Sequence, residues 1–147
     1  MKIVLGSDHA GFALKEELRA NLAKMAEEVA DFGTFCENSV DYPDIALPLA
    51  RAIAAGEYDR GILICGTGVG MAIAANKYPG IRAALCGDPF TARFAREHND
   101  ANILTLGARV IGPGLALEIV ETFVRSDFQG ERHSRRLQKI AFMEEQR

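Results

Sequence analysis

Short apolar runs alternate with longer helical patterns along this chain, and this alternation constrains the fold more than any other feature. The apolar runs predict strands at residues 2–5, 29–32, 61–65, 82–85 and 103–106. Helical spacing or a proline at a helix start predicts helices at residues 11–28, 44–55, 69–76, 89–97 and 115–125. Strands and helices in this order form βαβ units, in which right-handed crossovers place helices on both faces of a parallel sheet. We therefore predict one α/β domain over residues 1–147, a doubly wound, Rossmann-like five-stranded sheet.

The C-terminal segment, residues 131–147, has a character of its own. A turn precedes it, and residues 131–146 carry basic side chains together with an apolar stripe at helical spacing, formed by Leu137, Ile140, Ala141 and Phe142. A solvated, charged helix is one interpretation. The other is a helical arm that docks on a second subunit and supplies cations to its site, and the apolar stripe favours this docking.

Composition and charge exclude several classes of partner. The chain of 147 residues has a formal net charge of −3, which gives no electrostatic case for nucleic-acid binding. Its cysteines, Cys36, Cys65 and Cys86, form no CxxC pair and leave one unpaired in any disulfide scheme, as in a reducing compartment. No signal peptide is recognisable, and no apolar run approaches the ~20 residues that a membrane helix needs. We predict a cytoplasmic protein with no membrane partner.

One decapeptide, residues 61–70 (GILICGTGVG), has the features of a catalytic site. A predicted buried strand ends at Cys65, and glycines follow at alternate positions, Gly66, Gly68 and Gly70, before a predicted helix. Such a turn presents unpaired backbone N–H groups and the positive end of a helix dipole to an anion. The spacing does not fit G-x-G-x-x-G, because Met71 occupies the third required position, and no phosphate-binding P-loop is present. We therefore predict no nucleotide cofactor.

Two histidines, His9 and His98, lie after a predicted strand and at the end of a predicted helix, respectively. Asp8-His9 follows the first predicted strand, and since ligands bind at the carboxyl ends of parallel strands, it is expected near Cys65. The pair can equally be a helix cap. His98 lies at a predicted helix end, where it either interacts with the helix dipole or acts as a general acid–base. The histidines lack metal-ligand spacing such as H-E-x-x-H, so we predict no metal.

Seven sequence blocks resemble, in order, the ribose-5-phosphate isomerases of type B. The resemblance extends to the wider sugar-phosphate isomerase group that includes galactose-6-phosphate isomerase subunits, and it covers nearly the whole chain. The blocks are residues 6–12 (GSDHAGF), 41–44 (DYPD), 61–70 with 74–77 (GILICGTGVG and AANK), 80–83 (GIRA), 96–102 (REHNDAN), 107–109 (GAR) and 132–133 (RH).

The resemblance implies metal-free aldose–ketose isomerisation of a sugar phosphate through a cis-enediolate. Cys65 corresponds to the base that moves a proton between C1 and C2, whereas some family members use a glutamate elsewhere. Thr67 and His98 complete the implied catalytic set, with His98 assisting in opening the furanose ring. The amides of Gly66, Gly68, Val69 and Gly70 would stabilise the enediolate, while Asp8 and Asn99 would contact the sugar.

The resemblance also implies a phosphate site and an oligomer. His9, Arg109, Arg132 and Arg136 would bind the phosphate, for which the bidentate arginine fork is well suited. The family assembles its site at a dimer interface, so a homodimer, or a tetramer, with shared active sites is expected. The leading reaction is ribose 5-phosphate to ribulose 5-phosphate. Alternatives are isomerisation of a tetrose, allose or galactose phosphate, or a non-catalytic sugar-phosphate-binding module.

Overall fold

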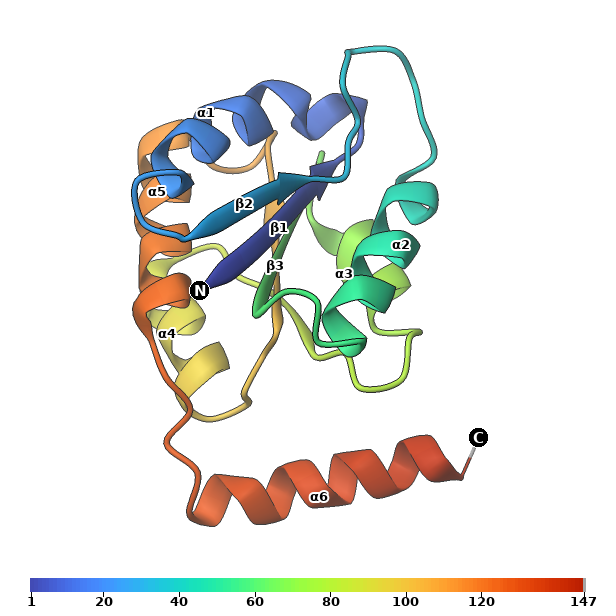
Figure 1. Ribbon diagram of the computed structural model, residues 1–147, viewed down its shortest axis with the longest axis vertical. Helices are drawn as coiled ribbons and strands as arrows, with labels where there is room; N and C mark the ends of the chain where they lie inside the picture. The colour runs from blue at the N-terminus through green and yellow to red at the C-terminus, as the bar shows by residue number, and fades with distance from the viewer. Residues whose placement is uncertain (147) are drawn as a thin grey trace.

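A five-stranded parallel sheet forms the centre of the molecule (Figure 1). The computed structural model describes residues 1–146. In spatial order β2-β1-β3-β5-β4, the sheet comprises β1 (Lys2–Ser7), β2 (Glu28–Asp31), β3 (Arg60–Cys65), β4 (Ala83–Leu85) and β5 (Ile103–Gly107). Ser7 lies opposite Ile64, and Cys65 lies opposite Gly107, so β1, β3 and β5 end nearly level with one another.

Helices cover both faces of the sheet, which confirms the predicted α/β fold. The elements are a short 3-10 helix (His9–Gly11), α1 (Phe12–Leu22), α2 (Tyr42–Ala54), α3 (Val69–Ala75), α4 (Pro89–Glu97), α5 (Pro113–Arg125) and α6 (Arg132–Glu145). Helices α1, α4 and α5 pack on one face, and α2 and α3 pack on the other (Figure 1). The helices that follow β1 and β5 therefore lie on one face of the sheet, whereas the helix that follows β3 lies on the other. In parallel sheets, ligands bind outside the carboxyl ends of strands at such a point of divergence.

The two faces have separate apolar cores because successive strand residues point to opposite sides. Along β3, Ile62 and Ile64 pack under α1 and α5, while Leu63 and Cys65 pack under α2 and α3. All four side chains are 5% exposed or less, as expected for a central strand covered on both faces. The strand that carries Cys65 is thus held rigidly from both sides.

The first helix is shorter than predicted. We expected it to span residues 11–28, but α1 ends at Leu22 and β2 begins at Glu28. Beyond α1 the N–H groups of Met25 and Ala26 both donate to the carbonyl of Leu22, and that of Glu27 donates to Met1. The chain turns because Glu27 already pairs with the start of β1, while Met25 still packs against the core and so preserves the apolar spacing. The other predicted boundaries agree with the observed ones to within two residues, and those of α4 coincide with them.

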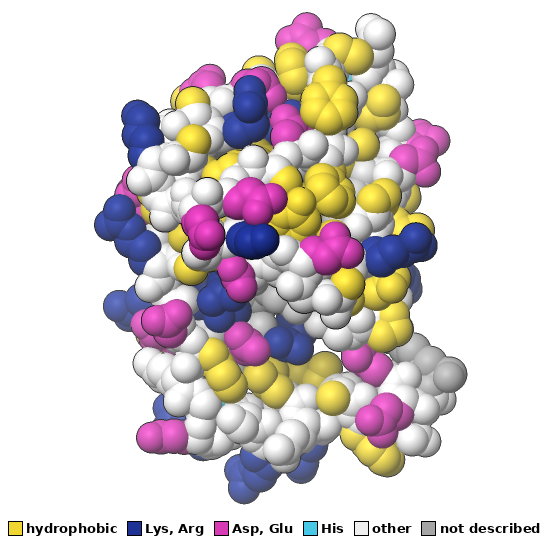
Figure 2. All heavy atoms as spheres, in the orientation of Figure 1, with side chains coloured by type: hydrophobic (Ala, Val, Ile, Leu, Met, Phe, Trp, Pro, Cys, Tyr) yellow, Lys and Arg dark blue, Asp and Glu magenta, His cyan; other side chains and the backbone are white. Residues whose placement is uncertain are grey.

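Helix α6 stands apart from the rest of the molecule (Figures 1 and 2). A cavity of about 400 Å³ separates it from the body, with Leu137, Ile140 and Met143 on the α6 side. Figure 2 shows apolar side chains along the edge of α6 that faces the body. Near its end, Glu144 accepts a hydrogen bond of 3.0 Å from the amide of Gly80. Within residues 1–146, none of the helices is both long and apolar enough to span a bilayer.

Candidate active site

Three loops meet at the carboxyl edge of the sheet and are hydrogen-bonded to one another. The amide of Asp8, after β1, donates to the carbonyl of Ile64 at 3.1 Å. After β5, the amide of Ala108 donates to Cys65 at 2.8 Å, and that of Arg109 donates to Gly66 at 3.0 Å. The backbone therefore fixes the loop after β3 between the other two. This arrangement confirms that the loops carrying Asp8 and Cys65 converge.

Cys65 lies where these three loops meet, at the end of β3. Its side chain is 5% exposed, and its sulfur accepts a hydrogen bond of 3.1 Å from the amide of Gly68. Gly68 has φ of +80°, and a Cβ there would lie 2.5 Å from a methyl of Leu85 and 2.9 Å from the Leu106 carbonyl carbon. Only glycine fits this position, and its conformation directs the amide at the sulfur.

A cation and an aromatic ring flank the glycine turn. A Cβ on Gly66 would lie 3.4 Å from the guanidinium of Arg109, so this side chain lies directly beside the turn. A Cβ on Gly70 would lie 2.8 Å from the ring of Tyr42, the first residue of α2. Tyr42 is not among the predicted site residues, because the predicted helix starts only at residue 44. Its position within the DYPD block was the signal that could have singled it out.

The side chains of Asp8 and His9 both accept hydrogen bonds from nearby backbone amides, and the two residues lie in one of the three loops that meet at this edge of the sheet. Asp8 is 7% exposed, and its Oδ1 accepts from the amides of Ala10 and Gly11, so it does cap the short helix that follows. Nδ1 of His9 accepts a 3.3 Å hydrogen bond from the amide of Val40. In neutral His9 this bond leaves the proton on Nε2, where it can be donated to an anionic ligand.

Thr67 and Val69 complete the turn at the start of α3. Both are exposed, and the hydroxyl of Thr67 accepts a 3.3 Å hydrogen bond from the amide of Val69. The hydroxyl is thereby oriented at the rim of the glycine turn rather than in the core.

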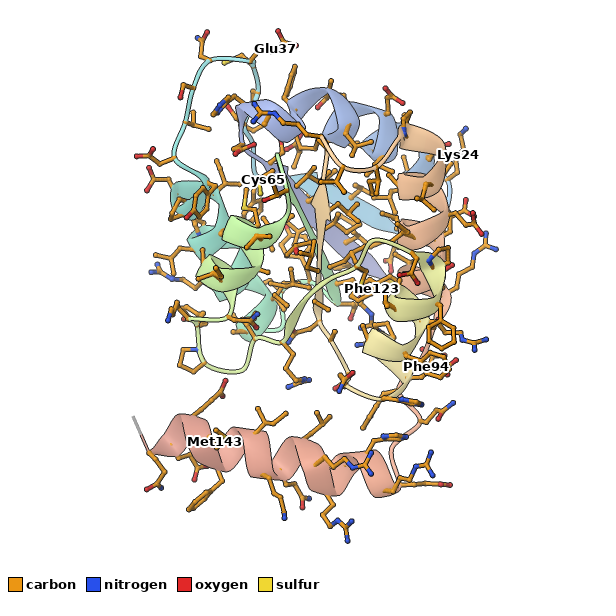
Figure 3. All side chains as sticks on the ribbon, turned by 180° about the vertical axis from the view of Figure 1, so that it is seen from behind. Lys24, Glu37, Cys65, Phe94, Phe123 and Met143 are labelled. Atoms are coloured by element: carbon orange, nitrogen blue, oxygen red, sulfur yellow. The ribbon has the colours of Figure 1, made fainter. Side chains whose placement is uncertain are left out.

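The remaining predicted site residues lie at the opposite edge of the sheet. Helix α4 starts after β4 and runs back, so its C-terminal end, which His98 and Asn99 follow, lies near the amino end of β5. Arg132 and Arg136 lie on α6 below it. Figure 3 places Cys65 well away from Phe94 and α6. One chain therefore brings together Asp8, His9, residues 65–70 and Arg109, but it does not bring His98, Asn99, Arg132 or Arg136 to them.

The exposed arginines among the predicted site residues, at either edge of the sheet, lack acidic partners. Among residues 1–146, Arg109, Arg132 and Arg136 form no ion pair with a carboxylate. Four other arginines, Arg19, Arg82, Arg93 and Arg96, do form such pairs, and Arg96 and Arg82 both bind Asp100. Each edge of the sheet thus presents guanidinium groups that are available to an external anion.

The other cysteines differ from Cys65 in their surroundings. Cys86 is 2% exposed, and burial raises the pKa of its thiol to about 11, so it stays protonated as a core residue. Cys36 is exposed in the loop between β2 and α2. Within the described part of the chain, no three His, Cys, Asp or Glu side chains gather as a metal site would require.

Comparison with known proteins identifies the family. The family model described as Ribose/Galactose Isomerase matches residues 3–140. The chain therefore belongs to the ribose/galactose isomerase family.

Relatives within this family carry more specific names. A protein of Escherichia coli named ribose-5-phosphate isomerase B is 48% identical, with 99% of this chain and 98% of that protein aligned. The structure of a ribose-5-phosphate isomerase B from Clostridium thermocellum has a TM-score of 0.97 at 57% identity and covers 99% of both chains. A protein of Pectobacterium atrosepticum named D-erythrulose-4-phosphate isomerase is 43% identical over 99% of this chain and 97% of its own length.

Proposed function

We propose that this chain interconverts ribose 5-phosphate and ribulose 5-phosphate by proton transfer through a cis-enediolate. The observation that carries the proposal is the Cys65 thiol, which meets the Gly68 amide within a turn of backbone donors beside Arg109. A binding module would use the cations but has no need for a thiol at this position. The family and the names of its relatives support the same reaction.

In the proposed reaction, Cys65 removes the proton from C2 of the open-chain aldose and delivers it to C1. Negative charge first develops on the C1 oxygen, and the amides of residues 66–70 stabilise it as an oxyanion hole does. A proton then passes from the C2 hydroxyl to the C1 oxygen, and the C2 carbonyl forms as C1 takes up the proton held by Cys65. Thr67 assists at the rim of the turn, and Asp8 binds sugar hydroxyls through the carboxylate oxygen that does not cap the helix. No metal takes part in this scheme.

The second group of residues is proposed to act in the active site of another subunit. His98 would open the furanose ring, Asn99 would contact the sugar, and Arg132 and Arg136 would bind the phosphate together with His9 and Arg109. Because the two groups lie at opposite edges of one chain, a site containing both requires a second copy. The apolar edge of α6 and the cavity beneath it support docking of residues 131–147 on that copy in a homodimer, or in a tetramer built from such dimers.

Mixed dimers test this shared site. If Cys65→Ala and Arg136→Ala subunits are refolded together at equal amounts, half of the dimers are mixed, and each mixed dimer has one intact site and one doubly defective site. Recovery of about a quarter of wild-type turnover is therefore expected from two nearly inactive parents. Steady-state rates before and after mixing provide the measurement.

A matched control uses two defects at the same edge. A mixture of Cys65→Ala and Arg109→Ala subunits should recover nothing, because both residues belong to one half-site and every site in a mixed dimer keeps one defect. Equal recovery in the two mixtures, or none in the first, would contradict the shared site.

Isomerisation of a tetrose phosphate is the second candidate, favoured by the name of the Pectobacterium atrosepticum relative. A comparison of kcat/KM for ribose 5-phosphate and D-erythrose 4-phosphate separates the two. The proposal expects the pentose phosphate to have the higher value, and a higher value for the tetrose phosphate would reassign the substrate.

A further inference from the structure

Four rings form a column of contacts from α4 to α6, in which the first two contacts are tilted and only the last is stacked. Phe90, Phe94 and His98 lie four residues apart on α4, with ring centroids 4.6 and 4.5 Å from one ring to the next. His133 of α6 continues the column, since its ring lies face to face with that of His98 at 4.1 Å and an interplanar angle of 12°. The column seats the start of α6 against the end of α4.

His133 has the environment of a neutral, fixed side chain. It is 4% exposed, whereas Arg132 and Arg136 beside it are exposed. Its Nε2 accepts a hydrogen bond of 3.5 Å from Nε of Arg132. Burial lowers the pKa of His133, as do its electrostatic interactions with His98, Arg132 and Arg136, and only Glu131 opposes them among the groups that act on it. His133 therefore presents an uncharged ring face to its neighbour near neutral pH.

The carboxylates next to the α4 histidine already have other partners. Glu97 accepts a hydrogen bond of 3.1 Å from Gln129. Asp100 is bound by Arg96 at 2.9 Å and by Arg82 at 2.8 Å. Among residues 1–146, no carboxylate is hydrogen-bonded to the imidazole of His98, and the ring of His133 stacks on it.

We propose that His133 is a positioning residue whose ring holds His98 in the orientation required to open the sugar ring. This inference rests on the proposed function. In that step the C1–O4 bond breaks, its electron pair goes to O4, and His98 donates a proton to O4. The anomeric hydroxyl then returns its proton to the imidazole as the C1 carbonyl forms, so no net proton is gained or lost. An imidazole free to rotate would meet O4 in the required orientation less often.

Two variants separate the stacked ring from the hydrogen bond. His133→Phe keeps a ring against His98 but removes the acceptor for Arg132, whereas His133→Gln keeps an acceptor and removes the ring. For ribose 5-phosphate, we expect kcat to fall about 10- to 100-fold in His133→Gln and to stay within about threefold in His133→Phe. The inhibition constant of inorganic phosphate, which reports Arg132 and Arg136, should not change in either variant.

A loss of kcat accompanied by an equal weakening of phosphate inhibition would show that His133 only seats α6, and this result would overturn the proposal. Wild-type kcat in His133→Gln would overturn it as well. Absence of wild-type turnover with ribose 5-phosphate would instead refute the proposed function. In that case NMR still tests the stack, because the upfield ring-current shift of the His98 Cε1 proton should persist in His133→Phe and disappear in His133→Gln.

Discussion

Replacement of Cys65 by alanine is expected to lower kcat for ribose 5-phosphate by about 10³-fold or more, because the proton on C2 then has no base. The side chain is small and lies at the end of β3, so binding of the sugar phosphate should change little. Stopped or continuous assays of ribulose 5-phosphate formation give kcat, and calorimetric titration with ribose 5-phosphate gives the dissociation constant.

Cys86→Ala is the matched control for this substitution. Cys86 is also a buried thiol, but it lies on the opposite face of the sheet from Cys65 and packs in the other apolar core. Its removal should lower stability by about 1 kcal/mol and leave kcat within about twofold. If Cys65→Ala retained wild-type kcat, or if both variants lost it equally, Cys65 would not be the base.

Replacement of Gly107 by alanine should disrupt catalysis without touching any proposed catalytic side chain. A Cβ at Gly107 would lie 2.7 Å from the backbone carbon and oxygen of Thr67, so the turn after β3 has to move. Misplacing an oxyanion-hole donor costs on the order of 10²–10³ in kcat. Overpacking of this kind also destabilises by about 1–3 kcal/mol, so kcat and the melting temperature should both fall.

Gly114→Ala serves as the control, because a Cβ there meets no atom within 4 Å and the residue lies in the first turn of α5. It should leave kcat unchanged and raise the melting temperature slightly, since alanine favours helix more than glycine does. A Gly107→Ala enzyme with wild-type kcat would show that the position of the turn does not limit turnover.

Most of the fold could be predicted from the sequence because strands buried on both faces leave a clear pattern. Residues 61–65 form an uninterrupted apolar run, and residues 103–106 are apolar except for Thr105; these segments form the central strands β3 and β5. The order of strands could not be predicted, since β4 lies at the edge and β5 inserts between it and β3. The end of α1 was missed because Met25 keeps the helical spacing while the backbone has already turned.

The half of the site at the carboxyl edge of the sheet was more predictable than the half that contains His98 and Arg136. A strand that runs into Cys65 and alternating glycines indicates an anion-binding turn beside a thiol from local sequence alone, and the position of the loop with Asp8 follows from topology. That His98 and Arg136 lie at the other edge depends on the direction of α4 and the path of α6, which local patterns do not contain. The contact of His133 with His98 joins two helices far apart in sequence, so no spacing rule could reveal it.

The most direct test of the central claim is proton NMR of ribose 5-phosphate incubated with the enzyme in D₂O containing a metal chelator. We predict that ribulose 5-phosphate forms, that solvent deuterium enters its C1 position over repeated turnovers, and that Cys65→Ala abolishes both signals while Cys86→Ala preserves them. Three results would contradict the account. They are no ketose formation, turnover that requires an added divalent cation, or complete retention of the substrate hydrogen after many turnovers, as a hydride shift would give.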